Sequence, residues 1–374
     1  MRVLIAPDSF GETLTAVRAA DAMASGWSTA RPDDVVVLAP QSDGGPGFVD
    51  VISTTVGEVR SVRVEGPLGR PVEARWVLAE TPETPAAPEA PGVTAYVESA
   101  QAVGLGLLDG PPSPRSALDA HSRGVGQLIG AALDAGAARI VVGLGGSCCT
   151  DGGRGMIAAL GGLDRARRRL TAIDLVAATD VENPLLGEHG AARIFGPQKG
   201  ADADAIEELE RRNTAWAAEL AAFVDGPVAD LTGAGAAGGL GAALLALGAR
   251  REPGASIVAQ CTGQARQLAS ADLVLTGEGR FDHQSLRGKL VTALADAANR
   301  AGVPTVVIAG QVTVDRDTVR GAGIAAAFSV TEFAGSVERA MREAGPLIES
   351  LTSSVAGGWR EASGFTHIGP IHEE

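Results

Sequence analysis

The chain has 374 residues, of which 45% are hydrophobic and 20% charged, a composition typical of a globular protein long enough for two domains. Its formal net charge of -14 disfavours binding to nucleic acid and to anionic lipid surfaces, because their phosphate groups would be repelled. The 50 glycines show no three-residue period, which excludes a collagen-like chain.

Signals for export, disulfide formation and membrane insertion are weak. Met1 leads directly into an apolar run, without the basic region and long apolar segment of a secretory signal, so we expect a cytoplasmic protein. The adjacent Cys148 and Cys149 favour reduced thiols over a disulfide framework. The uncharged stretch from Leu231 to Ala249 is rich in glycine, which favours a buried helix over a membrane span.

Both ends of the chain alternate short apolar runs with amphipathic segments, the pattern of a doubly wound parallel sheet. We predict strands at Arg2 to Ala6, Val35 to Leu38, Asp272 to Thr276, Thr305 to Ala309 and Ala325 to Val330. We predict helices at Thr13 to Thr29, Gly47 to Thr55, Lys289 to Ala301 and Val337 to Val355. The expected fold class is α/β, with a doubly wound, flavodoxin-like domain built from residues 1–66 and 271–374.

The middle of the chain, residues 67–270, has strands and helices of its own and is predicted to be an inserted α/β domain. The predicted strands are Ala74 to Leu78, Thr94 to Glu98, Arg139 to Val142 and Asp174 to Ala177. The predicted helices are Val125 to Ala135 and Ala205 to Phe223. The proline-rich piece from Thr81 to Pro91 is predicted to be a solvated loop, because proline removes hydrogen-bond donors from a strand.

Acidic side chains follow several predicted strands of the flavodoxin-like domain. Asp8 follows the first strand, Asp43 the second, and Glu278 and Asp282 the third. Ligands of an open parallel sheet bind beyond the carboxyl ends of its strands. A single acid at a helix start commonly caps the helix, but the convergence of several acids favours catalysis or metal binding.

Two glycine-rich segments are candidates for phosphate binding. The loop from Gly143 to Gly153 follows a strand and precedes a helix, so its bare backbone N–H groups can face a phosphate. The segment from Gly233 to Gly241 contains GxGxxG, but the poor strand before it disfavours a nicotinamide-binding oxidoreductase. The absence of GxxxxGK[ST] and of GxSxG excludes a P-loop enzyme and disfavours a serine hydrolase.

Lysine usage gives a further indication of phosphate binding. Nearly all of the 31 basic residues are arginine, and lysine occurs only at Lys199 and Lys289, both in glycine-flanked segments. Where arginine is the default, a retained primary amine indicates that a compact point charge is needed, as at a phosphate. For Lys289, an ion pair with Asp282 is the alternative interpretation.

Seven segments, in chain order, resemble those of the bacterial glycerate 2-kinase family. They are APDSF with LTA (6–16), SDGG (42–45), GLGGS with TDGG (143–153), DVENPLLG (180–187), FGPQKGA (195–201), GAGAAGGLG (233–241) and TGEGRFDHQSLRGK (276–289). The resemblance implies a two-domain α/β protein whose inserted domain closes a cleft. It also implies phosphorylation of glycerate to 2-phosphoglycerate, with ATP and Mg²⁺ as cofactors.

Phosphoryl transfer requires alignment of the reactants, neutralisation of the phosphate oxygens and a group that orients the acceptor hydroxyl. We predict catalytic roles for Asp8, Asp151 and Lys199, and the choice of base between Asp8 and Asp151 stays open. The residues predicted to bind ATP are Gly145, Gly146, Ser147, Gly235, Gly238 and Lys289. The residues predicted to bind the acceptor are Ser9, Phe10, Asp43, Gly44, Gly45, Phe48 and Asn183. The residues predicted to bind Mg²⁺ are Asp43, Glu278 and Asp282.

The chain departs from the family pattern near the predicted acceptor site. Where the family motif DSFKG has lysine and glycine, this chain has Gly11 and Glu12. Where DGGEGT has glutamate and threonine, it has Pro46 and Phe48. Where GGSATNDGG has asparagine, it has Thr150. Loss of a cation weakens binding of a small carboxylate, and Phe48 adds apolar surface. The alternatives are therefore a family kinase for a larger or more apolar hydroxy acid, or a catalytically weak nucleotide-binding relative. A small hydroxy acid is the expected partner, without nucleic acid or membrane, and a homodimer is left open.

Overall fold

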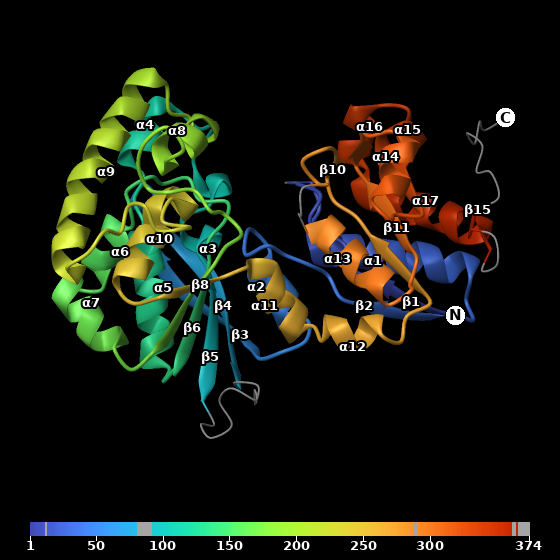
Figure 1. Ribbon diagram of the computed structural model, residues 1–374, viewed down its shortest axis with the longest axis horizontal. Coiled ribbons are helices and arrows are strands. Elements are labelled where there is room, and N and C mark those ends of the chain that lie inside the picture. The colour runs from blue at the N-terminus through green and yellow to red at the C-terminus, as the bar shows by residue number, and fades with distance from the viewer. Residues whose placement is uncertain (12, 81–91, 287–289, 361–363, 366–374) are drawn as a thin grey trace. The chain divides into compact units, whose positions relative to one another are not determined.

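The structure of the chain is a computed structural model that describes residues 1–11, 13–80, 92–286, 290–360 and 364–365. It divides into two compact units, one of residues 1–42 with 258–374 and the other of residues 43–257. In Figure 1 the first unit combines blue segments with orange and red ones, so the two ends of the chain share one unit. The predicted proline-rich loop, residues 81–91, lies outside the described residues.

The first unit is built on a parallel sheet of five strands in the order β13-β11-β9-β1-β2. The strands are β1 (Arg2–Ile5), β2 (Val35–Leu38), β9 (Leu273–Thr276), β11 (Thr305–Ala309) and β13 (Ala326–Ser329). Counted along the chain and read from β2, this order is 2-1-3-4-5, the order of a flavodoxin-like sheet. The predicted strands and the predicted fold class of this unit are confirmed.

Helices cover both faces of this sheet because its strands are apolar on both faces. Val3 and Ile5 of β1 pack in a core with α1 and α17, whereas Leu4 between them packs with α13. The helices are α1 (Ala16–Ala30), α12 (Gln264–Leu268), α13 (Leu290–Arg300), α14 (Arg316–Gly321), α15 (Val330–Ala334), α16 (Val337–Arg342) and α17 (Ala344–Gly358). The helix predicted from Val337 to Val355 is therefore two helices, α16 and α17.

Two short strand pairs complete the first unit. They are the parallel pair β10 (Arg280–Phe281) with β12 (Gln311–Val312), and the antiparallel pair β14 (Trp359–Arg360) with β15 (Gly364–Phe365). In the chain, β10 comes directly after β9 and β12 directly after β11, so this pair lies at the carboxyl end of the main sheet.

The second unit has a mixed sheet of six strands in the order β3-β4-β5-β6-β7-β8. They are β3 (Glu58–Glu65), β4 (Pro71–Glu80), β5 (Val93–Glu98), β6 (Arg139–Gly143), β7 (Asp174–Ala178) and β8 (Arg250–Glu252). The first three strands are antiparallel neighbours, and the strands from β5 to β8 are parallel. The apolar pattern of the sequence does not predict β3 or β8, because charged residues interrupt β3 and make up all of β8.

The helices of the second unit pack around one large apolar core. They are α2 (Phe48–Ser53), α3 (Ala100–Val103), α4 (Pro114–Asp119), α5 (Arg123–Asp134), α6 (Arg154–Ala159), α7 (Leu163–Leu170), α8 (Ala191–Phe195), α9 (Ala203–Val224) and α10 (Ala236–Ala246). The second unit also has two single 3₁₀ turns, η1 (Leu105–Leu107) and η2 (Pro197–Lys199). The helix α11 (Gly254–Cys261) spans the point in the chain where the second unit ends.

The unit boundaries differ from those expected at residues 66 and 270. Residues 43–66 belong to the second unit, since β3 pairs with β4 from Glu58 to Glu65. Residues 258–270 belong to the first unit, where Leu268 of α12 joins the core beneath β1. Contacts formed by strand pairing and core packing therefore set both boundaries.

The glycine-rich stretch after Leu231 forms α10, which is interrupted near its start. Ala237, Gly238 and Gly239 have positive φ angles of 49°, 68° and 93°, so the first turn is left-handed. Among the described residues, no helix combines the length and the apolar character needed to cross a membrane.

Candidate active site

Two loops of the first unit meet at the carboxyl end of its sheet, where the strand order reverses between β1 and β9. The Asp8 N–H donates to the Gly277 carbonyl at 2.8 Å, and the Gly279 N–H donates to the Ser9 carbonyl at 3.2 Å. Glu278 lies between these two glycines. The structure therefore brings Asp8, Ser9 and Glu278 into adjacent loops at the position where such sheets bind ligands.

Other predicted residues of the first unit have structural contacts that explain them without a ligand. Phe10 is only 6% exposed and packs in the core around α1, which argues against the predicted contact with the acceptor. Asp282 accepts hydrogen bonds from the N–H groups of Gln284 at 2.7 Å and Ser285 at 3.3 Å, as an acid that caps a turn does. Lys289 lies outside the described residues.

Two loops of the second unit carry most of the other predicted residues. We call residues 43–47, which lead into α2, the acidic loop, and residues 143–153, between β6 and α6, the glycine loop. A Cβ at Gly143 would come within 2.6 Å of the Gly44 carbonyl oxygen. The two loops therefore pack against each other directly, backbone to backbone.

The closest approach between the two loops is at Gly145. A Cβ at this position would overlap the Cα of Gly45, and a Cβ at Gly146 would overlap the ring of Pro46. Because a backbone atom cannot move aside as a flexible side chain does, only glycine fits at Gly145. Packing between the loops accounts for these glycines independently of any phosphate.

Lys199 lies against the second half of the glycine loop. Its side chain is 2% exposed, and its Nζ donates to Ser147 Oγ at 3.0 Å and to the Cys149 carbonyl at 2.6 Å. Burial lowers the pKa of Lys199, although nearby thiol and carboxyl groups raise it. A Cβ at Gly238 would lie 2.8 Å from Nζ, so the left-handed turn of α10 packs directly on this amine.

Asp151 anchors the end of the glycine loop. Its Oδ2 accepts hydrogen bonds from Ser122 N–H at 2.8 Å, Ser122 Oγ at 2.8 Å and Gly155 N–H at 2.9 Å. Its Oδ1 accepts from Gly153 N–H at 3.1 Å. These hydrogen bonds join the loop to the starts of α5 and α6. The geometry therefore favours a structural role for Asp151 over the role of a catalytic base.

Asp43 of the acidic loop lies near a second carboxylate, Asp180, which follows β7. Asp43 Oδ1 accepts from Gly45 N–H at 2.9 Å. Burial and then the charge of Asp43 raise the pKa of Asp180, whereas a hydrogen bond from Ala255 N–H lowers it. No group of three or more His, Cys, Asp or Glu side chains suited to a metal ion occurs in the described part of the chain.

Two other predicted residues of the second unit, Phe48 and Asn183, make contacts within it. Phe48 is fully buried and meets Tyr96 edge to face, with 6.3 Å between the ring centroids. The side chain of Asn183 donates through Nδ2 to the His189 backbone carbonyl at 2.9 Å. The backbone carbonyl of Asn183 accepts a hydrogen bond from the Gly235 N–H at 2.9 Å. The ring of Phe48 therefore adds to the core and does not make the predicted acceptor site more apolar.

Three residues at these loops are absent from the predicted set. Ser122 donates to Asp151 of the glycine loop, and Asp180 lies near enough to Asp43 for its charge to raise the pKa of Asp180. Glu98 contacts the start of α2 through the Val49 N–H at 3.0 Å. A carboxylate at the end of the apolar strand β5 is a sequence signal for Glu98. Nothing in the sequence pattern identifies Ser122.

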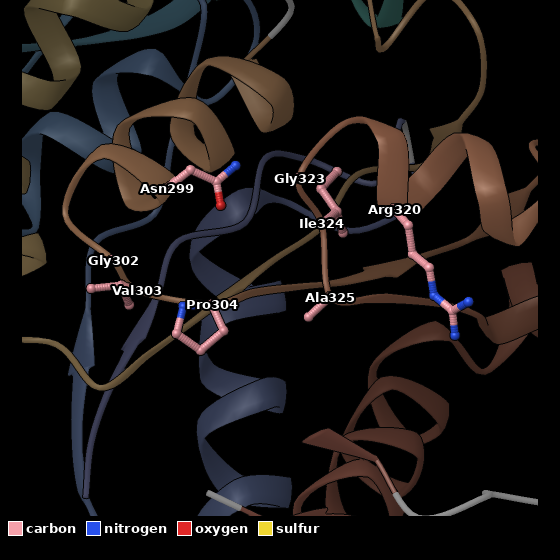
Figure 2. Close-up of a pocket in the computed structure, with 8 residues that line it drawn as sticks. All are labelled: Asn299, Gly302, Val303, Pro304, Arg320, Gly323, Ile324 and Ala325. Atoms are coloured by element: carbon pink, nitrogen blue, oxygen red, sulfur yellow. The ribbon is translucent and has the colours of Figure 1, made fainter. Parts of the chain in front are cut away.

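A surface hollow of about 460 Å³ lies elsewhere on the first unit (Figure 2). It is lined by Asn299, Gly302, Val303, Pro304, Arg320, Gly323, Ile324 and Ala325. Pro304 and Ala325 directly precede β11 and β13, so the hollow lies at the amino end of the parallel sheet. The loops of Asp8 and Glu278 lie at the opposite end, and the hollow is not part of the candidate site.

Comparisons with known proteins agree along almost the whole chain. The model of the glycerate kinase family matches residues 3–165 and 162–360. An uncharacterized protein of Mycobacterium tuberculosis is 57% identical over 357 residues, which cover 95% of this chain and 91% of the relative. Glycerate 2-kinase of Escherichia coli K12 is 38% identical over 395 residues, which cover 97% of this chain and 100% of that enzyme. A crystal structure described as glycerate kinase 2 from Salmonella typhimurium LT2 superposes with a TM-score of 0.74 and 36% identity, covering 95% of this chain and 97% of the other.

The flavodoxin-like unit, the glycine loop and these relatives together define a kinase that transfers a phosphoryl group to a hydroxyl acceptor. As a kinase, the protein uses a nucleotide. The chain belongs to the glycerate kinase family.

The packing of the two loops makes a prediction about Gly145. Gly145→Ala is expected to lower the free energy of unfolding by about 1 to 3 kcal/mol, because the new methyl group must displace the backbone of Gly45. Gly106→Ala is the matched control in the same unit, since a Cβ there meets nothing within 4 Å. Urea unfolding measures both variants, and equal stability of the two would contradict the packing.

Proposed function

We propose that this protein transfers the γ-phosphoryl group of ATP, bound with Mg²⁺, to the 2-hydroxyl of glycerate, giving 2-phosphoglycerate. The observation that carries the proposal is the convergence of Lys199, the glycine loop and the left-handed turn of α10 on one another. Such a constellation supplies N–H groups and a positive charge, which are the groups that phosphate oxygens require. The E. coli enzyme matched over its whole length carries the name glycerate 2-kinase, which supports the acceptor and the position.

Lys199 fits the role of neutralising phosphate charge. Its amine is held by Ser147 Oγ and the Cys149 carbonyl, which orient it within the glycine loop. An ammonium group has three donors, so a third remains for a phosphate oxygen. A bound anion would also favour the charged form that burial disfavours.

The carboxylates of Asp43 and Asp180 fit a magnesium ion that is held jointly with nucleotide phosphates. Mg²⁺ is commonly bound by one or two carboxylates, with phosphates and water completing its shell. Asp43 and Asp180 are close enough for the charge of one to raise the pKa of the other, and a cation relieves such repulsion. We therefore assign Asp180 to the predicted metal-binding set beside Asp43. When bound, Mg²⁺ neutralises charge on the phosphate oxygens.

The base that orients the acceptor hydroxyl is assigned to Asp8. Asp151, the other predicted candidate, already accepts hydrogen bonds from Ser122, Gly153 and Gly155 on both carboxylate oxygens. Asp8 itself accepts a hydrogen bond from the Ser9 N–H to Oδ1 at 2.6 Å. It lies beside Glu278 at the reversal of strand order, where ligands of this sheet type bind. We also keep Glu278 as a predicted metal-binding residue of this end of the sheet.

A different hydroxy acid is the second candidate acceptor, and Gly11 is the observation that favours it. Gly11 has a φ of +58°, and a Cβ there meets nothing within 4 Å, so the position where the family pattern has lysine is open. Burial of Phe48 removes the other argument for an apolar acceptor. Location in the cytoplasm and assembly as a homodimer stay predictions from the sequence.

A coupled assay of ADP release tests the proposed function. We expect turnover of D-glycerate that requires ATP and Mg²⁺, with 2-phosphoglycerate as the product by phosphorus NMR. A panel of larger hydroxy acids serves as the comparison. Higher kcat/KM on a panel member than on D-glycerate would reject glycerate as the acceptor. ATP binding by calorimetry without turnover on any acceptor would reject the catalytic proposal.

Replacement of Lys199 tests its role at the phosphate. Lys199→Met keeps most of the side-chain stem but removes the charge, and we expect kcat to fall by about 100-fold or more. Arg193→Met is the control, because Arg193 is exposed and its ion pair with Glu207, at 2.8 Å, contributes little. Thermal unfolding of each variant shows whether a lower kcat results from an unfolded protein or from impaired catalysis. A folded Lys199→Met protein with unchanged kcat would show that Lys199 only supports the loop.

A further inference from the structure

Glu98 ends strand β5 as a buried carboxylate directly beside the two loops. It is 2% exposed, and in the sheet it pairs in register with Gly143, the first residue of the glycine loop. Its Oε2 accepts the Val49 N–H at 3.0 Å, and the Gly47 N–H also donates to the carboxylate. Glu98 therefore holds the junction at which the acidic loop becomes α2.

This junction depends on Glu98 because α2 is too short to fix its own start. The helix has six residues, and its preceding residue, Gly47, has a left-handed φ of 94° and no side chain that could cap the helix. Helices of this length are marginal by themselves, so tertiary contacts set where they begin. The hydrogen bonds from Val49 and Gly47 to Glu98 are such contacts, and they fix the acidic loop at its carboxyl end.

The surroundings of Glu98 contain few charges. Asp50 faces it from α2 and is itself paired with Arg75 of β4, and Gln101 of α3 donates a hydrogen bond to it. On β6 the neighbour is Gly143, which has no side chain. Burial raises the pKa of Glu98 to about 7, and the charge of Asp50 adds to this, while the N–H groups of Val49 and Gly47 and the Gln101 amide lower it.

Such a carboxylate lowers the stability of the fold when it is ionised. Since the pKa of Glu98 is higher in the folded chain than in the unfolded chain, its contribution to stability falls as the pH rises from the unfolded pKa towards about 7. A glutamine of the same shape would avoid this cost. Hydrogen bonds to an ionised acceptor are, however, roughly twice as strong as neutral ones, so the ionised form holds the N–H groups more firmly.

We propose that Glu98 is a positioning residue for phosphoryl transfer: its ionised carboxylate holds the start of α2, and thereby the acidic loop with Asp43, in the productive arrangement against the glycine loop. This inference rests on the proposed function for its effect on catalysis. The tie between Glu98 and the acidic loop is independent of the substrate and of any activity.

Glu98→Gln tests the proposal because it keeps the shape and removes the charge. In the wild type, kcat should fall as the pH is lowered through the pKa of about 7. In Glu98→Gln, kcat at pH above this value should be at least about tenfold lower and should lose that pH dependence. The melting temperature of the variant should equal or exceed that of the wild type at the same pH, because no charge is buried. Glu58→Gln is the control, since Glu58 is an exposed carboxylate of the same unit at the start of β3.

Amide hydrogen exchange of residues 43–53 supplies a readout that needs no enzymatic activity. We expect faster exchange of these residues, Val49 above all, in Glu98→Gln than in the wild type and in Glu58→Gln. Unchanged exchange, an unchanged pH profile of kcat, or a Glu98→Gln protein that melts earlier or does not fold would overturn the positioning role. If the wild type phosphorylates no acceptor, the proposed function fails while the exchange result still decides whether Glu98 holds the loop.

Discussion

The contact on which the site depends is the backbone-to-backbone packing of the acidic loop on the glycine loop. At Gly145 this contact excludes even a methyl group, since a Cβ would overlap the Gly45 Cα. Packing this close fixes the position of Asp43 relative to the glycine loop, to which Lys199 donates hydrogen bonds at Ser147 and Cys149. Glycine permits this approach because it has no Cβ. For the proposed binding of a phosphate, the same lack of a Cβ would let the anion approach the backbone closely.

Much of the fold could be predicted from the sequence because the strands of the first unit are apolar on both faces. Continuous apolar runs such as Thr305–Ala309 predict the strands, and their alternation with amphipathic segments favours the doubly wound class that the structure has. The boundaries of the units and the strands β3 and β8 could not be predicted in the same way. Strand pairing decides them, and the charged residues of β3 lie on both of its faces, so no local pattern marks it.

The candidate site was only partly predictable, for a related reason. Residue type and spacing predict roles for Asp8, Asp43 and Lys199, and these roles stay predictions. The structure brings the loop of Asp8 to that of Glu278, and Lys199 to the glycine loop, each within its own unit. The sequence does not distinguish a ring in the core from a ring in a pocket, and the structure buries Phe48, for which a substrate contact is predicted. The hydrogen bonds from Ser122 to Asp151 and from Val49 to Glu98 join residues distant in sequence, so the spacing of residues along the chain does not reveal these partners.

We propose that the acidic loop and the glycine loop form one platform that binds the nucleotide. The most direct measurement is amide hydrogen exchange with and without a non-hydrolysable ATP analogue and Mg²⁺. We expect the ligand to slow exchange in residues 43–53 and 143–153 together, because the loops share backbone contacts. Protection of only one of these segments, or of neither, would contradict it.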